Sequence, residues 1–230
     1  MSLVTSTFEK AFGNNYKELR ELLVEFGELK SFKKGEFIIK EGEPAYGFYW
    51  VLKGGAKVSI QTNTKTEQIV TVLSSADFVG ISAVMERHLH NKSAYVLSDS
   101  AEVLFISQAD FFKYLQKYPM VVLPLLKHIE EKIERIEKRA AQIMRKTIEQ
   151  RLAYVLIMLQ KKFGSDEQGF LEFQLSPKDL ANFIGTTRTT VYRVLRKLQD
   201  NHIVNSEHKR VQILQSDRLQ ELFSQQAVLV

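Results

Sequence analysis

The sequence contains no cysteine and only four prolines among its 230 residues. The absence of cysteine excludes disulfide bonds, thiolate zinc sites, cysteine-ligated iron-sulfur clusters and thiol catalysis. No stretch approaches the run of about 18 apolar residues that a membrane span needs. The N-terminus, MSLVTSTFEK, also lacks the basic start and apolar run of a signal peptide. We therefore expect a cytoplasmic protein with no membrane contact and no iron-sulfur cluster.

The net charge is small but unevenly distributed. The formal net charge is +5, and residues 1–126 carry 14 basic and 14 acidic side chains, whereas residues 127–230 carry 18 and 13. The whole basic excess therefore lies in the C-terminal part, which fits a polyanionic partner such as nucleic acid. A solvated charged surface has the same composition, so the charge alone does not decide between the two.

Residues 30–110 alternate short β-branched and aromatic runs with glycines. The runs are 37–39, 47–52, 57–60, 69–73, 94–97 and 103–106. Regular short strands separated by turn residues are typical of a β-barrel or sandwich. Before them, apolar residues at roughly helical spacing between Phe8 and Phe26 predict a short helical segment that packs on the barrel.

From Leu126 the apolar pattern changes to a heptad. On an otherwise charged helix the spacing alternates between 3 and 4, through Leu126, Ile129, Ile133, Ile136, Ala140 and Ile143. So narrow a stripe predicts a coiled-coil seam and a parallel homodimer, although it could instead dock on the barrel of its own chain. No proline-rich linker follows this helix. We therefore expect three parts, a sensor barrel (1–119), a dimerisation helix (120–146) and a C-terminal domain (147–230), with the helix connecting the other two.

Within the C-terminal domain, residues 175–198 predict a helix-turn-helix. Ser176-Pro177 supplies a side-chain acceptor at the N-cap and a proline at the first helical position, where its missing N–H costs nothing. Gly185 then supplies the turn, and one of the pair Thr186-Thr187 can cap a second helix over about 188–199.

The second helix of this motif is amphipathic. Its core face is predicted to hold Val191, Leu195 and Leu198, and its outer face Arg188, Thr189, Tyr192, Arg193 and Lys197. Arginine suits major-groove reading because its planar fork pairs with O6 and N7 of guanine together. The runs 203–204 and 211–214 flank a polar turn and predict a β-hairpin, which makes the domain a winged helix with Lys209 and Arg210 placed for phosphates. The alternative is an ordinary helical hairpin with a solvated outer face.

Three segments carry a resemblance to a known family: EGEPAYGFYWVLKGGAKV, DFVGISAV and LSPKDLANFIGTTRTTVYRVLRKLQDNHIV. Together with the domain order, they resemble the cyclic-AMP receptor protein and fumarate-nitrate regulator (Crp-Fnr) superfamily over nearly the whole chain. The resemblance implies an α+β fold with an N-terminal cyclic-nucleotide-binding-type β-barrel (a double-stranded β-helix), a long dimerisation helix and a C-terminal winged helix-turn-helix. It also implies a transcription regulator, not an enzyme, that binds double-stranded DNA at a two-fold symmetric site and contacts RNA polymerase.

The resemblance also assigns roles to single residues. Arg188 and Arg193 match family positions that contact bases, and Thr190 matches one that commonly contacts phosphate. Thr189 stands where the best-known members carry a base-reading glutamate, and because threonine does not accept from cytosine N4 as a carboxylate does, we expect a different half-site. The expected DNA-binding residues are Thr187, Arg188, Thr189, Thr190, Tyr192, Arg193, Lys197, Lys209 and Arg210.

The sensor positions depart from the family pattern. In members that bind cyclic AMP, a glutamate after DFVG holds the ribose hydroxyl and an Arg-Ser pair holds the cyclic phosphate, whereas this sequence has Ile81 and Lys92-Ser93 there. We therefore expect that the protein does not bind cyclic AMP, and we identify no cofactor. The two alternatives are that it responds to a different small effector or that it acts constitutively. The candidate effector pocket is Gly80, Ile81, Ser82, Lys92 and Ser93, and the aromatic residues Phe48, Tyr49, Trp50 and Tyr95 are expected mainly in the barrel core.

Two histidines suggest alternatives that we also weigh. His88 and His90 lie on one polar loop without acidic companions, a pattern more typical of exposed surface than of metal or haem ligands. They have the His-x-His spacing of a cupin enzyme, but Asp99 and Glu102 are weak candidates for its carboxylate. A cyclic-nucleotide-type sensor that acts through protein contact is the other alternative, and it leaves the helix-turn-helix unexplained.

Overall fold

The computed structural model describes residues 2–12, 17–62, 66–86, 88–143, 146–207 and 210–224. The chain divides into two compact units, residues 1–134 and 135–230, and helix α5 (Val122–Ile143) contributes to both. The functional boundaries expected at 119/120 and 146/147 stay predictions, because compactness does not itself mark a functional domain. Within the described part, none of the helices is long and apolar enough to cross a membrane.

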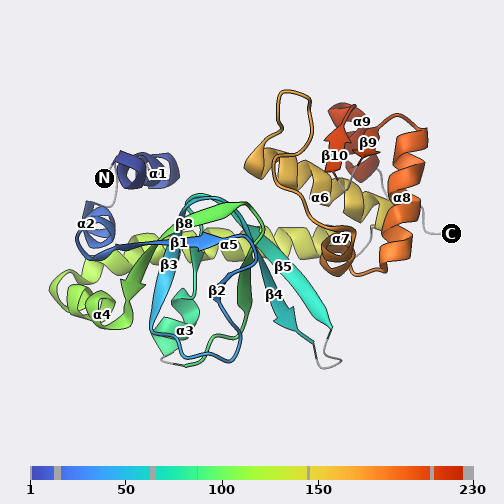
Figure 1. Ribbon diagram of the computed structural model, residues 1–230. Helices are drawn as coiled ribbons and strands as arrows, with labels where there is room; N and C mark the ends of the chain where they lie inside the picture. The colour runs from blue at the N-terminus through green and yellow to red at the C-terminus, as the bar shows by residue number, and fades with distance from the viewer. Residues whose placement is uncertain are drawn as a thin grey trace. The chain divides into compact units, whose positions relative to one another are not determined.

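The first unit is built on two antiparallel sheets of four strands each (Figure 1). Its strands are β1 (Glu28–Lys33), β2 (Phe37–Ile39), β3 (Gly47–Lys53), β4 (Ala56–Gln61), β5 (Glu67–Leu73), β6 (Phe78–Val79), β7 (Ser93–Val96) and β8 (Ser100–Ser107). One sheet has the order β1-β8-β3-β6 and the other β2-β7-β4-β5. The predicted barrel is confirmed, while β1, whose sequence is mostly polar, and β6, which has only two residues, were not expected.

The position of strand β3 explains why its sequence is almost continuously apolar. Its residues alternate between two faces, and both faces are covered. Val51 pairs with Val103 of β8 and faces the core between the two sheets, together with Val58 of β4 and Ala94 of β7. Trp50 belongs to a second core on the other face and is fully buried. A strand buried on both faces needs no polar alternation.

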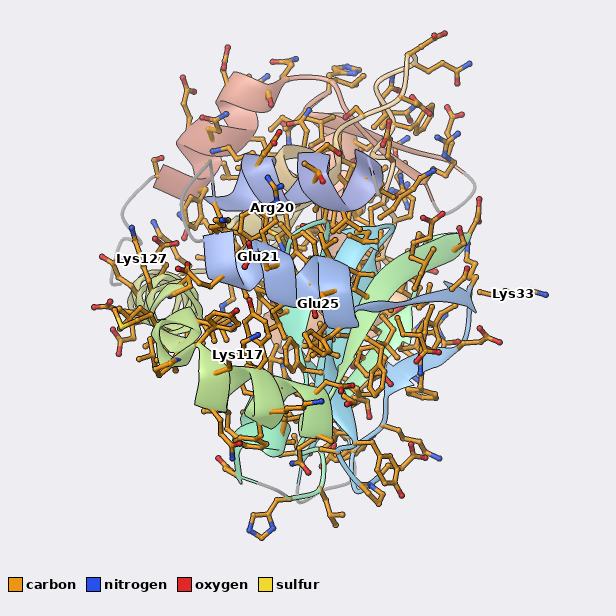
Figure 2. All side chains as sticks on the ribbon, turned by 90° about the vertical axis from the view of Figure 1, so that its left-hand side faces the viewer. Arg20, Glu21, Glu25, Lys33, Lys117 and Lys127 are labelled. Atoms are coloured by element: carbon orange, nitrogen blue, oxygen red, sulfur yellow. The ribbon has the colours of Figure 1, made fainter. Side chains whose placement is uncertain are left out.

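Helices cover the outer face of the first sheet. They are α1 (Ser2–Phe12), α2 (Lys17–Phe26), α4 (Gln108–Lys117), the 3₁₀ turn η1 (Pro119–Val121) and the start of α5. Phe8, Leu22, Phe111 and Leu125 bring these elements into the same core as Trp50. Figure 2 shows α2 lying between α1 and α4, with charged side chains such as Arg20 on its outer side. The single helical segment predicted here is two helices.

After the end of α5, the second unit holds further helices and a hairpin. Its elements are α6 (Ile148–Phe163), α7 (Pro177–Ile184), α8 (Arg188–Asp200), β9 (Val204–Glu207), β10 (Arg210–Ile213) and α9 (Ser216–Ser224). A capping box starts α6: the Thr147 side chain accepts from the backbone of Gln150, and the Gln150 side chain accepts from Thr147 N–H. Helix α9, which was not predicted, packs on α6 through Phe223 against Tyr154, 5.2 Å between ring centroids.

Candidate nucleic-acid interface

Helix α7 and the turn after it form as the sequence predicts. Ser176 caps α7, because its Oγ accepts from Asp179 N–H at 3.1 Å and donates to the Asp179 carboxylate at 2.5 Å. Pro177 is the first helical residue. Gly185 ends the helix in the left-handed region, at φ 70° and ψ 53°, where its N–H donates to Ala181 O. A residue with a Cβ is strained in this conformation, so glycine makes the tight turn into α8 possible.

Two threonines shape the start of α8. Thr187 is the N-cap, since its hydroxyl accepts from Thr190 N–H at 3.2 Å, and the two hydroxyl oxygens lie 3.0 Å apart. The free N–H groups and the helix dipole make this end of α8 favourable for an anion. The geometry fits the phosphate contact that the family resemblance implies for Thr190.

The faces of α8 are strongly separated. Val191, Val194, Leu195 and Leu198 are buried against the rest of the second unit. At about 3.6 residues per turn, the opposite direction is occupied by a row of exposed side chains: Thr189, Arg193, Arg196 and Asp200. Arg188 and Tyr192 are also exposed and lie beside this row, on one side of it.

Arg196 is a candidate DNA contact that the sequence reasoning missed. It follows Arg193 by three residues and Thr189 by seven, so the helical spacing was sufficient to place it on the outer face. It also lines a groove of about 490 Å³ between α8 and the hairpin, together with Tyr192, Gln199 and Ser206. No ion-pair partner for Arg188, Arg193 or Arg196 occurs among the described residues.

Two other expected cations have carboxylate partners. Lys197 Nζ lies 2.5 Å from Oε2 of Glu149, in the first turn of α6. In the hairpin, which gives the winged arrangement expected, Arg210 pairs with Asp166 and lies over the ring of Phe170, 4.5 Å from its centroid. Lys209 lies outside the described residues.

Asp166 is held in place from several directions. One oxygen accepts the N–H groups of Gln168 and Phe170, at 3.0 and 2.9 Å, while the other pairs with Arg210. Desolvation raises the pKa of Asp166, but the hydrogen bonds from Arg210, Phe170 and Gln168 outweigh it and hold the pKa below its ordinary value. The carboxylate is therefore ionised at neutral pH, and its negative charge offsets the positive charge of Arg210.

The candidate effector residues lie on two segments of the first unit. Gly80 has φ 89°, and a Cβ there would come within 3.2 Å of His90 Cε1, so glycine allows close packing. Ile81 and Ser82 begin α3 (Ile81–Glu86), and Lys92 is half-buried. The Ser93 hydroxyl accepts from the backbone N–H of Glu41 at 3.0 Å, so it already holds a structural hydrogen bond.

His90 corrects one expectation. His88 is exposed, as predicted, but His90 is buried at 7% exposure because its backbone pairs with Gly42 and Glu43. Burial lowers the pKa of His90 and outweighs the charge of Glu43, which acts in the other direction. Among the described residues there is no group of three or more potential metal ligands.

The predicted seam on α5 is largely uncovered. The side chains of Leu126, Ile133 and Ile136 are 53%, 50% and 53% exposed. By contrast, Val121 and Leu125 are buried and pack in the core of the first unit. Leu123, also half-exposed, extends the row toward the N-terminus. Ile129 is partly buried, Ala140 is exposed, and the Ile143 side chain lies outside the described side chains. Leu126 and Ile133, which belong to the same unit as the barrel, are therefore not covered by it.

A sensor-type barrel followed by a winged helix-turn-helix defines a class, the DNA-binding transcription regulators. A family model described as "Cyclic nucleotide-binding domain" matches residues 29–118, and one described as "Crp-like helix-turn-helix domain" matches residues 150–222. The chain belongs to the Crp-Fnr family of transcription regulators.

Individual relatives agree with this assignment. The "Probable transcriptional regulator flp" of Lacticaseibacillus casei is 27% identical over 212 residues, covering 91% of this chain and 94% of that protein. The "cAMP-activated global transcriptional regulator CRP" of Pasteurella multocida is 24% identical over 176 residues, covering 76% and 84%. The solved structure of FixK2 from Bradyrhizobium japonicum has a TM-score of 0.73 at 22% identity, covering 87% of this chain and 99% of that one. The first two are named as transcriptional regulators, in agreement with the expectation that the chain is not an enzyme, and the likeness to FixK2 is one of fold.

Proposed function

We propose that the protein acts as a homodimer that reads a two-fold symmetric DNA site with two copies of α8. The observation that carries the proposal is the outer face of α8, where Arg188, Arg193 and Arg196 are exposed and lack an ion-pair partner in the described chain. Arginines in the first turns of such a helix reach base edges in the major groove, while Thr187 and Thr190 at its start suit a phosphate.

The uncovered row on α5 supports the dimer. Leu126, Ile133 and Ile136 are half-exposed at heptad spacing, and a second α5 packed against the row would remove them from water. Pairing α5 in parallel would present two α8 helices, whose centres must be about 34 Å apart to enter successive major grooves. The half-site is expected to differ from that of the best-known members because Thr189 replaces their glutamate.

Three further proposals concern RNA polymerase, the location in the cell and the effector. Contact with RNA polymerase is proposed from family membership, and the cytoplasm is proposed because that is where bacterial relatives meet their DNA. For the effector, Ile81 offers no hydrogen bond to a ribose, and Lys92 presents a point charge in place of a bidentate fork. We therefore propose a small effector other than cyclic AMP, or constitutive action.

The DNA proposal is tested by capturing genomic fragments with the purified full chain. We expect a two-fold symmetric motif, and on that motif Arg188→Ala and Arg193→Ala should each cost about 1–3 kcal/mol of binding free energy and relax specificity at one base pair. Arg20→Ala, on α2 of the first unit, removes the same charge and should have little effect. Weak binding without a motif, equal for all three variants, would contradict the proposal.

The effector proposal has its own test. Thermal unfolding of the full chain is followed with cyclic AMP and with a panel of other nucleotides and small metabolites. A ligand that binds only the folded state raises the midpoint as its concentration exceeds the dissociation constant. We expect no shift with millimolar cyclic AMP; a saturable shift would reject this part of the proposal.

A further inference from the structure

The exposed cations of α8 fall into two groups. Arg188, Arg193 and Arg196 have no carboxylate partner among the described residues, whereas the Nζ of Lys197 lies 2.5 Å from Oε2 of Glu149. Lys197 lies at the edge of the outer face, toward α6, and its side chain is 61% exposed. One cation on this face is therefore neutralised before any DNA arrives.

Glu149 is held by parts of the fold that do not depend on Lys197. It lies in the first turn of α6, where the positive end of the helix dipole favours a carboxylate. The Thr147–Gln150 capping box fixes this turn, and the next turn is anchored by the buried Leu152 and Ala153. The Glu149 side chain is only 21% exposed, less than that of its partner. The acid is thus the fixed member of the pair, and the lysine is the movable one.

The pairing has a consequence for DNA. A phosphate that approaches Lys197 meets a net charge near zero, because the carboxylate lies within hydrogen-bond distance of the ammonium. Contacts to phosphates supply most of the affinity that does not depend on sequence, through release of counterions. Neutralising a flanking lysine therefore weakens sequence-independent binding more than it weakens base reading by Arg188 and Arg193.

We propose that Glu149 is a specificity-determining residue that acts through Lys197: it limits binding to DNA of any sequence and leaves base reading intact. This inference rests on the proposed function. The helix dipole accounts for an acid in the first turn of α6 but not for the lysine beside it, and a pair whose lysine is 61% exposed contributes little to stability. The hairpin repeats the arrangement, since Arg210 pairs with Asp166. Asp166 also holds two backbone N–H groups, which makes Glu149 the cleaner residue to change.

The test uses the full-length protein with two duplexes, one carrying the captured motif and one scrambled. Glu149→Gln keeps the size of the side chain and removes its charge. We expect scrambled-duplex affinity to rise about 3- to 10-fold and the salt slope to steepen by about 0.9, the value of one added phosphate contact. Affinity for the motif should rise less, so the ratio between the duplexes falls. In a Lys197→Ala background, Glu149→Gln should leave the slope unchanged.

Glu221→Gln is the matched control, because Glu221 is an exposed acid on α9 of the same unit. An equal rise in this control would show a general charge effect and overturn the proposal. Unchanged or weaker scrambled-duplex binding by Glu149→Gln would also overturn it, since the acid would then be positioning Lys197 for DNA.

A second comparison does not require a variant of Glu149 to fold. If Lys197 is already neutralised, Lys197→Gln should weaken scrambled-duplex binding less than about twofold, and less than Arg196→Gln does. Equal losses would overturn the proposal. The scrambled duplex requires no specific site, so failure to find a motif would count against the proposed function and leave this comparison readable.

Discussion

Helices α5 and α8 are both amphipathic, and each leaves one face uncovered, but the two faces call for opposite partners. The open row of α5 is apolar, with Leu126, Ile133 and Ile136 about half-exposed. The open face of α8 is cationic, and its arginines lack ion-pair partners in the described chain. An apolar row gains free energy by leaving water, whereas an arginine row gains by meeting fixed anions. The first therefore fits a second protein helix and the second fits a polyanion.

The largest effect is expected from a variant that places a charged side chain in the apolar row of α5. Ile133→Glu places a carboxylate in the centre of the expected seam, where it would be buried without a cation, so we expect a monomer. Loss of the second half-site contact should lower affinity for a two-fold symmetric duplex by about 10²- to 10⁴-fold, the size of a typical bivalent gain. Sedimentation equilibrium and binding titrations measure the two effects.

The matched control for Ile133→Glu is Leu29→Glu. Leu29 in β1 is 63% exposed but lies outside the heptad row, so this variant should stay a dimer with unchanged DNA affinity. A dimeric Ile133→Glu would show that the α5 row is not the seam.

The second prediction sets the two faces of α8 against each other. Leu198 is fully buried, so Leu198→Ala should lower the unfolding free energy of the second unit by about 2–5 kcal/mol. Arg193→Ala, on the outer face, should change it by less than about 0.5 kcal/mol. The single tryptophan, Trp50, lies in the first unit, so its fluorescence follows that unit while helical circular dichroism includes the second. Equal losses in both variants would mean that the outer face is also packed.

Local signals explain why the helix-turn-helix could be predicted almost to the residue. Ser176, Pro177 and Gly185 act on their immediate neighbours, through an N-cap, a fixed φ and a left-handed turn. Six of the eight strands described in the first unit were predicted for the same reason, since apolar runs between glycines carry their own signal. Helix α9 was missed because its polar sequence has only Leu219 buried, and its position depends on α6.

Features that depend on distant contacts could not be predicted. Lys197 was expected to be free for DNA, because helical spacing shows which way a side chain points and not what another helix brings to it. Glu149 comes from 48 residues away. His90 was expected to be exposed for a similar reason: its burial arises from pairing with Gly42 and Glu43. Arg196 is different, because its spacing was visible and was overlooked.

The third prediction sharpens the cationic side of the comparison through Arg196. This residue is exposed in the row with Arg193, beside the groove between α8 and the hairpin. Arg196→Ala should weaken binding to the captured motif by about 1–3 kcal/mol, with no change in the dimer. Arg218→Ala on α9 removes an exposed arginine of the same unit and serves as the control. Equal losses from both would assign the effect to net charge.

The smallest expected effect separates the helix cap of α8 from its anion-binding role. Thr187→Ala removes the acceptor of Thr190 N–H, so the unfolding free energy should fall by about 1 kcal/mol, and Thr187→Ser should restore it. Thr187→Asp is the informative variant. Aspartate caps a helix as well as threonine does, and its charge is favoured by the helix dipole, so stability should be kept. The same charge would repel a phosphate, and DNA affinity should fall. If Thr187→Asp kept full DNA affinity, the start of α8 would not face the DNA backbone, and its open face would need a different partner from the one proposed.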